Sequence, residues 1–314
     1  MGKKYIHNTV KILKNPWVTR IYLVTLLLCV GFYFYMNIAN FKIIFYNANL
    51  KILFMAFIPY FLVVGVINPY LHKISYKSIG TNVTFWQAFR IFHLSRIGNY
   101  LPGRIWFAGN YYIFSKKLNI DNQSIAKNFV MLNIALFLMG GICSLPIVFH
   151  FMPSLKTGVV IFTCCMVLFI HPKIFTKLFS IIWDKDKVKS YSVMFLLKAL
   201  LLFGFSYTIL GLALYLTTYS FENIPIQFFP LVTGASAASL VCGLLAVFAP
   251  AGIGVMEGVR VGVLGSLVSF ENALMAVVAL RLIQVLIDFS CAFVSAVSVW
   301  NEERMVRRPT YLKT

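Results

Sequence analysis

Residues Phe85–Lys117 read FWQAFRIFHLSRIGNYLPGRIWFAGNYYIFSKK, and this stretch decides how the rest of the chain is interpreted. It is aromatic and apolar, yet it also carries a histidine and several arginines: His93, Arg90, Arg96 and Arg104. An arginine at the centre of a bilayer costs about 2.5–3.5 kcal/mol on insertion scales, so such side chains usually pair or face a cavity. Because Leu101-Pro102-Gly103 breaks the stretch in its middle, we interpret it as a helical hairpin that enters the bilayer and returns, with its arginines facing protein or water.

The composition is typical of a membrane protein. Of the 314 residues, 60% are hydrophobic and 12% are charged, and the mean hydropathy is +0.82. A soluble domain carries about 25% charged residues. The apolar runs are continuous rather than short and alternating, which favours helices over a β-barrel. We therefore expect an all-α integral membrane protein, a polytopic helical bundle that forms a single membrane domain over residues 1–314.

The distribution of basic residues predicts the topology. Apart from the hairpin, the apolar runs that can serve as spans lie at residues 21–39, 52–71, 129–155, 157–171, 199–221 and 272–300. Nineteen of the 28 Lys and Arg residues then fall in segments on one side of the membrane, and three fall on the other. Because basic residues mark the cytoplasmic side, we expect a multi-pass protein of the cytoplasmic (inner) membrane with both termini in the cytoplasm. The same asymmetry accounts for the net charge of +19, so we expect no nucleic-acid partner.

A second interrupted segment lies far down the chain. Residues 223–256 carry no charge, and they are too long for one span but too short for two. The break reads Phe248-Ala249-Pro250-Ala251-Gly252-Ile253-Gly254, and its length leaves open whether the segment re-enters or spans. Residues 52–155 and 194–300 then form two pseudo-repeats of opposite orientation, each with a re-entrant hairpin. Inverted repeats with paired broken helices are typical of secondary transporters, whose binding sites lie near the midplane.

The two breaks supply groups that bind an anion. Pro102-Gly103 and Gly252-Ile253-Gly254 each predict the start of a new helix, whose free N–H groups and positive dipole end attract negative charge. Arg96 and Arg104 flank the first break, and arginine binds phosphate through two donors at once. The alternative is an interfacial amphipathic helix that keeps these arginines among the lipid headgroups.

Glu257, shortly after the second break, is a candidate partner for these cations. It can pair with Arg260 one turn on, or in space with Arg281 or Arg96. If the two hairpins meet tip to tip, we expect Arg96, Arg104 and Glu257 to share one cavity near the midplane. Glu257 would then partly neutralise the arginines when no ligand is bound.

The last expected span carries a polar stripe at helical spacing, formed by Arg281, Gln284 and Asp288. A ligand contact and a structural salt bridge are both compatible with this pattern.

Two motifs resemble those of a known family. The segment from Arg96 to Arg104, RIGNYLPGR, resembles the R-x-x-N-x-L-P-G region of the lysylphosphatidylglycerol synthase transmembrane family. The segment from Ala249 to Glu257, APAGIGVME, resembles that family's P-x-G-x-G-x-x-E signature, and Arg281 matches a basic position. The resemblance implies a flippase-like domain that binds or moves anionic or polyprenyl-linked lipids. The best-known members add a soluble aminoacyl-transferase domain, for which this chain leaves no room, so we do not expect lipid aminoacylation.

We therefore predict a protein that binds or translocates a phosphate-bearing or polyprenyl-linked lipid in envelope or surface-polysaccharide assembly. The substrate-binding candidates are Arg96, Asn99, Arg104, Gly252, Gly254, Glu257 and Arg281. We expect no catalytic residue, metal site or cofactor, and the six cysteines lie in apolar runs without metal-site spacing.

Two other interpretations stay open. One is a membrane-embedded transferase acting on a lipid-linked sugar, supported by Asp184-Lys185-Asp186, whose carboxylates can hold a divalent metal. The other is a non-catalytic partner of other envelope-biosynthesis membrane proteins.

Overall fold

The structure is a computed structural model that describes residues 46–101, 105–151, 153–155, 157–158, 160–161, 177, 191–246 and 249–307. The elements in this part of the chain are all helices. Met1–Ala48 forms a separate unit that is described only from residue 46, so the fold below is that of Asn49–Thr314. The expected span at residues 21–39, and nearly all of the one at 157–171, lie outside the described residues.

The described residues contain five helical segments that are long and apolar enough to cross a membrane, which confirms the expected class of an all-α membrane protein. They are Leu50–Ser78, Asn122–Phe151, Val193–Tyr219, Ile226–Leu245 and Phe270–Trp300.

Two of these segments begin earlier than the charge pattern predicts. The expected starts at residues 129 and 199 are wrong, because capping side chains set the ends of these helices rather than the nearest lysine. The Asp121 side chain accepts a hydrogen bond from the Ser124 N–H and starts α9 (Asn122–Cys143). The Ser192 hydroxyl does the same for α13 (Val193–Tyr219).

The first described span changes its helical geometry along its length. It consists of α4 (Leu50–Met55), α5 (Phe57–Phe61), a π-helical stretch η1 (Leu62–Ile67) and α6 (Asn68–Ser78). Proline has no N–H to donate, so Pro59 and Pro69 each remove one backbone hydrogen bond from the helix. The wider π-helical turn lies between them, and such turns are frequent at functional sites.

The Phe85–Lys117 stretch forms a helical hairpin. It contains α7 (Phe85–Arg96), a 3-10 turn η2 (Ile97–Tyr100) and α8 (Ile105–Lys117). A capping box between Thr84 and Gln87 starts α7. Gly98 allows the two arms to approach closely, since a Cβ there would lie 2.7 Å from the Trp106 backbone carbonyl carbon.

The second interrupted segment also forms a hairpin, from α14 (Phe229–Leu245), a 3-10 turn η6 (Pro250–Gly252) and α15 (Val255–Leu264). As predicted, a new helix starts directly after Gly254. Gly252 has φ 69°, and a Cβ there would lie 2.9 Å from Met256 Cγ and 3.1 Å from Gly243 Cα. Only glycine fits this left-handed, crowded position without strain.

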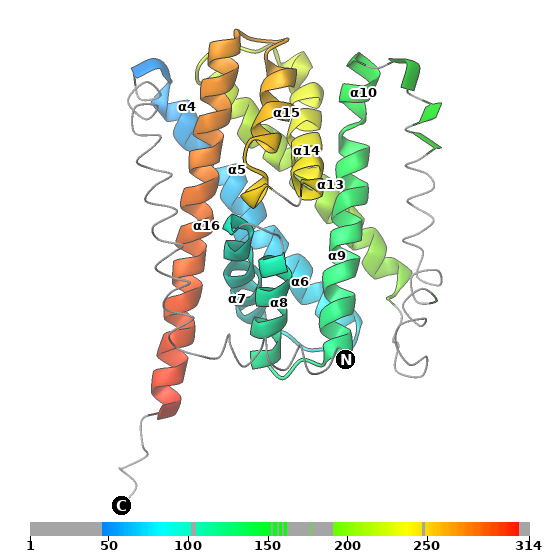
Figure 1. Ribbon diagram of the computed structural model, residues 1–314, viewed down its shortest axis with the longest axis vertical. Helices are drawn as coiled ribbons and strands as arrows, with labels where there is room; N and C mark the ends of the chain where they lie inside the picture. Colours follow the sequence, from blue (N-terminus) through cyan, green and yellow to red (C-terminus); the bar gives the residue numbers. More distant parts are fainter. Residues whose placement is uncertain are drawn as a thin grey trace, which may run out of the picture. The chain divides into compact units, whose positions relative to one another are not determined.

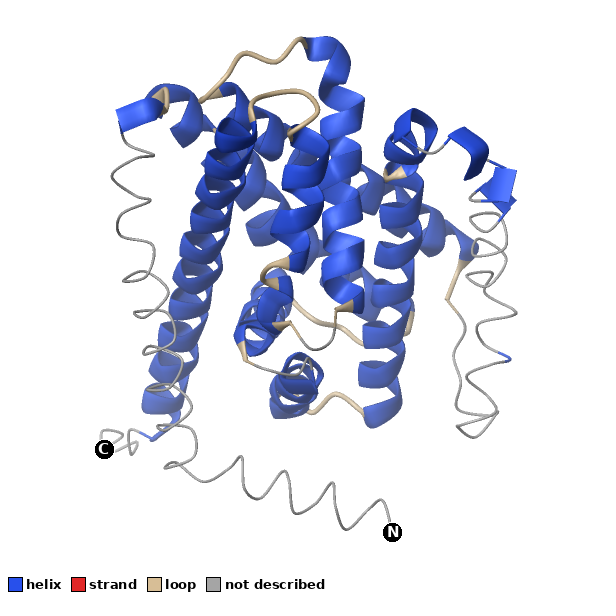
Figure 2. Cartoon of the chain, turned by 45° about the horizontal axis from the view of Figure 1, so that its top comes forward, coloured by secondary structure: helices blue, strands red, loops and turns tan. Residues whose placement is uncertain are grey.

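The order of elements repeats once: the span that ends in α6 is followed by the α7–α8 hairpin and α9, and α13 is followed by the α14–α15 hairpin and the last helix. The remaining elements have the following bounds. They are α10 (Leu145–Phe151), η3 (Pro153–Leu155), η5 (Ile226–Phe228) and α16 (Phe270–Arg307). The α7–α8 and α14–α15 hairpins approach each other from opposite ends of the bundle (Figures 1 and 2), and η2 contacts η6. The two hairpins therefore meet at their tips.

Candidate functional site

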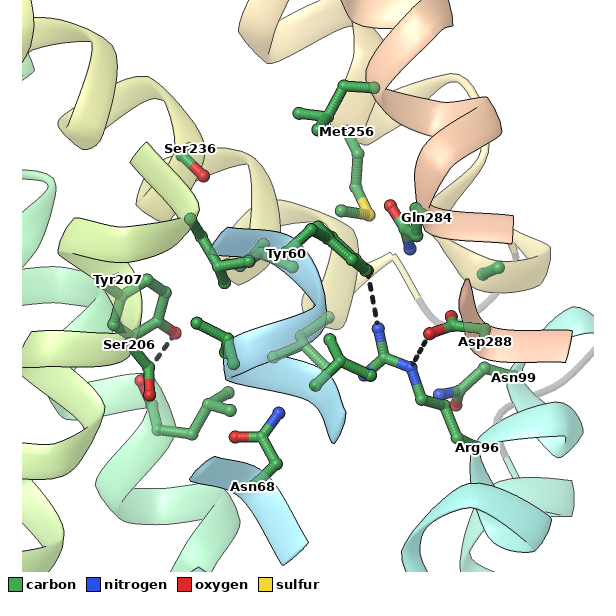
Figure 3. A pocket seen from close by; sticks show the side chains of 18 of the residues that line it. Tyr60, Asn68, Arg96, Asn99, Ser206, Tyr207, Ser236, Met256, Gln284 and Asp288 are labelled. Atoms are coloured by element: carbon green, nitrogen blue, oxygen red, sulfur yellow. Dashed lines mark hydrogen bonds and ion pairs between the residues drawn. The ribbon is translucent and has the colours of Figure 1, made fainter. Parts of the chain in front are cut away.

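A cavity of about 130 Å³ lies beside the two hairpin tips. Side chains from η1, η2, α9, α13, α14, η6, α15 and α16 line it together with the ends of α5 and α7 and the start of α6. Its polar lining includes Asn68, Asn99, Ser236 and Gln284, which come from four different elements (Figure 3). One water needs roughly 10–15 Å³ by the same measure, so the cavity has room for a small polar group with water around it.

Arg96 extends between Tyr60 and Asp288 in this cavity (Figure 3). Its Nε donates to Asp288 Oδ1 at 2.8 Å, and its Nη2 donates to the Tyr60 hydroxyl at 3.0 Å. The Tyr100 hydroxyl donates to the other carboxylate oxygen of Asp288 at 2.9 Å. Asp288 is only 3% exposed, and both of its oxygens have a donor, so the charge of Arg96 is balanced by a carboxylate on α16.

A second ion pair ties α15 to α16. Arg281 is 1% exposed, and its Nε lies 3.3 Å from Glu257 Oε1 without hydrogen-bond geometry, so this contact is electrostatic. Arg281 Nη2 also donates to the Ala251 carbonyl at 3.1 Å. The other oxygen of Glu257 accepts from the Gly254 N–H at 2.8 Å, which caps α15. Glu257 and Arg281 thus hold the second hairpin tip in place against the last span.

The tip that they hold is conformationally unusual. Ala251, Gly252 and Gly254 all have positive φ, at 49°, 69° and 83°. The left-handed conformation is costly for alanine, and such residues persist only where surrounding contacts fix them. The hydrogen bond from Arg281 to the Ala251 carbonyl is one of these contacts.

Arg260 carries the third guanidinium of this region, and it differs from those of Arg96 and Arg281. It lines the cavity and is 3% exposed. Its Nε donates to Ser239 Oγ at 2.9 Å, whereas its Nη1 is buried without a hydrogen-bond partner among the described residues. No described carboxylate lies within the 4.0 Å salt-bridge distance of it; those nearby belong to the pairs of Arg96 and Arg281.

The structure separates the predicted site residues into two groups. Arg96 and Asn99 line the cavity, whereas Glu257 and Arg281 pair with each other outside the described lining. We expected Glu257 to neutralise Arg96, but Asp288 does so. The carboxylate of Glu257 pairs with Arg281 instead. Gly252 and Gly254 form the hairpin tip. Arg104 and the Asp184-Lys185-Asp186 motif lie outside the described residues.

The cavity also contains residues that sequence reasoning did not select. Tyr60, Asn68 and Tyr100 line it, and each lies in a long apolar or aromatic run where a single polar group gives no signal. The polar stripe on the last span did point to Gln284 and Asp288, which both line the cavity. Arg260 has a signal of its own, as the one arginine of a short glycine-rich helix, but its spacing from Glu257 predicts only an ion pair within that helix.

No protein-family model matches the chain, and a comparison with curated proteins finds no significant similarity.

Proposed function

We propose that this protein binds a phosphate-bearing or polyprenyl-linked lipid at the hairpin tips and moves its headgroup across the cytoplasmic membrane. In this proposal the two hairpins are re-entrant and belong to an inverted repeat, and both termini face the cytoplasm. The lipid would serve envelope or surface-polysaccharide assembly. The protein acts as a translocator or binding scaffold and not as an enzyme.

One observation carries the proposal: the tips of the two hairpins contact each other beside a cavity whose largely apolar lining also includes the guanidinium groups of Arg96 and Arg260. Buried cations in a membrane domain mark ion or substrate pathways. Binding sites between paired broken helices are typical of transporters. The resemblance of RIGNYLPGR and APAGIGVME to the flippase-like family supports the same ligand class.

Lipid movement in vesicles that contain only this protein tests the proposal. Fluorescently labelled phosphatidylglycerol and a labelled polyprenyl phosphate are placed in both leaflets, and a membrane-impermeant quencher is added outside. Wild-type protein should make the inner-leaflet label accessible for one of these lipids. Vesicles whose label stays half protected for both lipids would contradict a translocator.

A variant pair assigns the movement to the cavity. Arg96→Met combined with Asp288→Leu removes two opposite charges together and so leaves neither of them unpaired. This protein should fold but move lipid several-fold more slowly. Gly109→Ala in α8 is the matched control, since a Cβ there meets no described heavy atom within 4 Å.

A further inference from the structure

We infer that Arg260 holds the negative charge of the ligand: its Nη1 is the donor for one phosphate oxyanion bound in the cavity between the hairpin tips. This inference rests on the proposed function, because it names the charged group of the same ligand. It adds a residue that neither the motifs nor the ion pairs had selected.

The charge balance around the cavity supports this assignment. The described side chains at the tips and on the facing part of α16 include three guanidinium groups, of Arg96, Arg260 and Arg281, and two carboxylates, of Glu257 and Asp288. Each carboxylate is within 3.3 Å of a guanidinium other than that of Arg260. Among the described side chains, the buried guanidinium of Arg260 therefore has no carboxylate of its own within salt-bridge distance. Buried charges are normally paired, since an isolated one is strongly disfavoured in a low-dielectric interior.

A hydrogen bond to α14 holds the Arg260 side chain in a defined position. Ser239 Oγ accepts from Arg260 Nε at 2.9 Å, and the same hydroxyl donates to the Ser236 carbonyl at 2.8 Å. Ser239 is completely buried, so these two successive hydrogen bonds fix one edge of the guanidinium plane against α14. Among the described residues the Nη1 group has no hydrogen-bond partner, and an unsatisfied buried donor costs about 1–3 kcal/mol, more when it is charged. A ligand oxygen would satisfy it.

The chemistry favours a singly charged oxyanion. One uncompensated cation among the described groups matches the single charge of a phosphodiester, and guanidinium is well suited to phosphate oxygens. A zwitterionic lipid carries the same phosphate but no net charge. It should therefore bind more weakly than an anionic lipid of equal chain length.

Thermal unfolding of the full-length protein in one detergent provides the test. The probes are dihexanoyl phosphatidylglycerol, dihexanoyl phosphatidylcholine and inorganic phosphate. The wild-type Tm should rise with the anionic lipid and rise less with the zwitterionic one. An equal rise with inorganic phosphate would assign the site to a free anion, and a rise with the lipid alone would assign it to a headgroup; both place an oxyanion in the cavity.

Arg260→Met is the decisive variant because its two effects have opposite signs. Without a ligand, its Tm should equal or exceed that of wild type, since an uncompensated buried charge has been removed. Its apparent affinity for the anionic lipid should fall about tenfold or more, as expected for a lost charge-assisted hydrogen bond. Arg260→Lys keeps the charge and should retain part of the affinity. Val259→Met, on the same helix but outside the described lining, should bind as wild type does.

Several outcomes would overturn the inference. A lower Tm of Arg260→Met without ligand, or its aggregation, would show that the folded state needs this cation for structural reasons. An unchanged affinity for the anionic lipid would show that Arg260 does not hold the ligand. If wild-type protein moves lipid in vesicles while Arg260→Met binds equally well, this inference fails and the proposed function stands. If wild-type protein neither binds nor moves lipid, the proposed function itself fails.

Discussion

Arg96 and Asp288 are separated by 192 positions in the sequence, yet Arg96 Nε lies 2.8 Å from Asp288 Oδ1. The pair joins the end of α7, at the first hairpin tip, to the middle of α16. The Tyr60 hydroxyl accepts a further hydrogen bond from Arg96, and the Tyr100 hydroxyl donates one to Asp288. This network connects the first hairpin to the last span across the wall of the cavity.

Removing one partner of this pair should destabilise the protein more than removing both. Asp288→Ala leaves a largely buried arginine without its carboxylate, which costs about 3–5 kcal/mol in buried pairs. Replacing both, as Arg96→Met with Asp288→Leu, should restore most of that loss. Unfolding free energies of the four proteins of the double-mutant cycle, measured in one detergent, give the coupling between the side chains. Strictly additive losses would mean that the two residues do not interact.

The close approach within the first hairpin predicts a contrast between two glycines. Gly98→Ala would bring a Cβ to 2.7 Å from the Trp106 backbone, and overpacking of this kind costs about 1–3 kcal/mol. Gly109→Ala, in α8 of the same hairpin, meets no described heavy atom within 4 Å and replaces a glycine by a residue that favours helix by about 1 kcal/mol. The unfolding midpoint should therefore fall for Gly98→Ala and stay level or rise for Gly109→Ala. Equal midpoints would contradict the hairpin geometry.

Glu222 should make stability depend on pH in the acid range. Hydrogen bonds from the Asn272 side chain and the Ser269 N–H lower the pKa of this carboxyl from its ordinary value of 4.5, with Asn272 as the largest cause. A pKa that is lower in the folded state adds stability above pH 4.5, and this stability is lost as the pH falls through the folded value. Thermal unfolding measured from neutral pH downwards should show a smaller acid-induced loss for Glu222→Gln than for wild type. Parallel curves for the two proteins would count against these hydrogen bonds.

The predicted topology places the two ends of the first hairpin on one side of the membrane. Single cysteines replacing Lys77 and Lys117, in a background without the six native cysteines, should be protected from an impermeant thiol reagent in intact cells. A cysteine replacing the exposed Asn223 should react. If the cysteines at positions 117 and 223 both react, the Phe85–Lys117 stretch spans the membrane fully. The interpretation as an inverted repeat would then be wrong.

Sequence alone determined the class of the protein and the position of its interruptions. Hydropathy, charge asymmetry, proline and glycine act over one or a few helical turns, so they are readable without knowing which helices are neighbours. The hairpin tip after Gly252 and the helix start after Gly254 follow from such local rules. The exact helix ends did not, because the capping residues Asp121 and Ser192 start α9 and α13 before the lysines that precede the expected spans.

Only the tertiary structure decided which charges pair. Sequence reasoning left Glu257 with three candidate partners and gave none to Asp288 specifically. A buried ion pair forms between the groups that packing brings within a few ångströms, and hydropathy carries no information on those distances. Once the tips meet, Arg281 pairs with Glu257 and Arg96 pairs with Asp288. Arg260 then lies beside the cavity, and its Nη1 has no hydrogen-bond partner among the described residues. This arrangement of charges is a property of the assembled helices, because the residues that form it come from three of them, α7, α15 and α16.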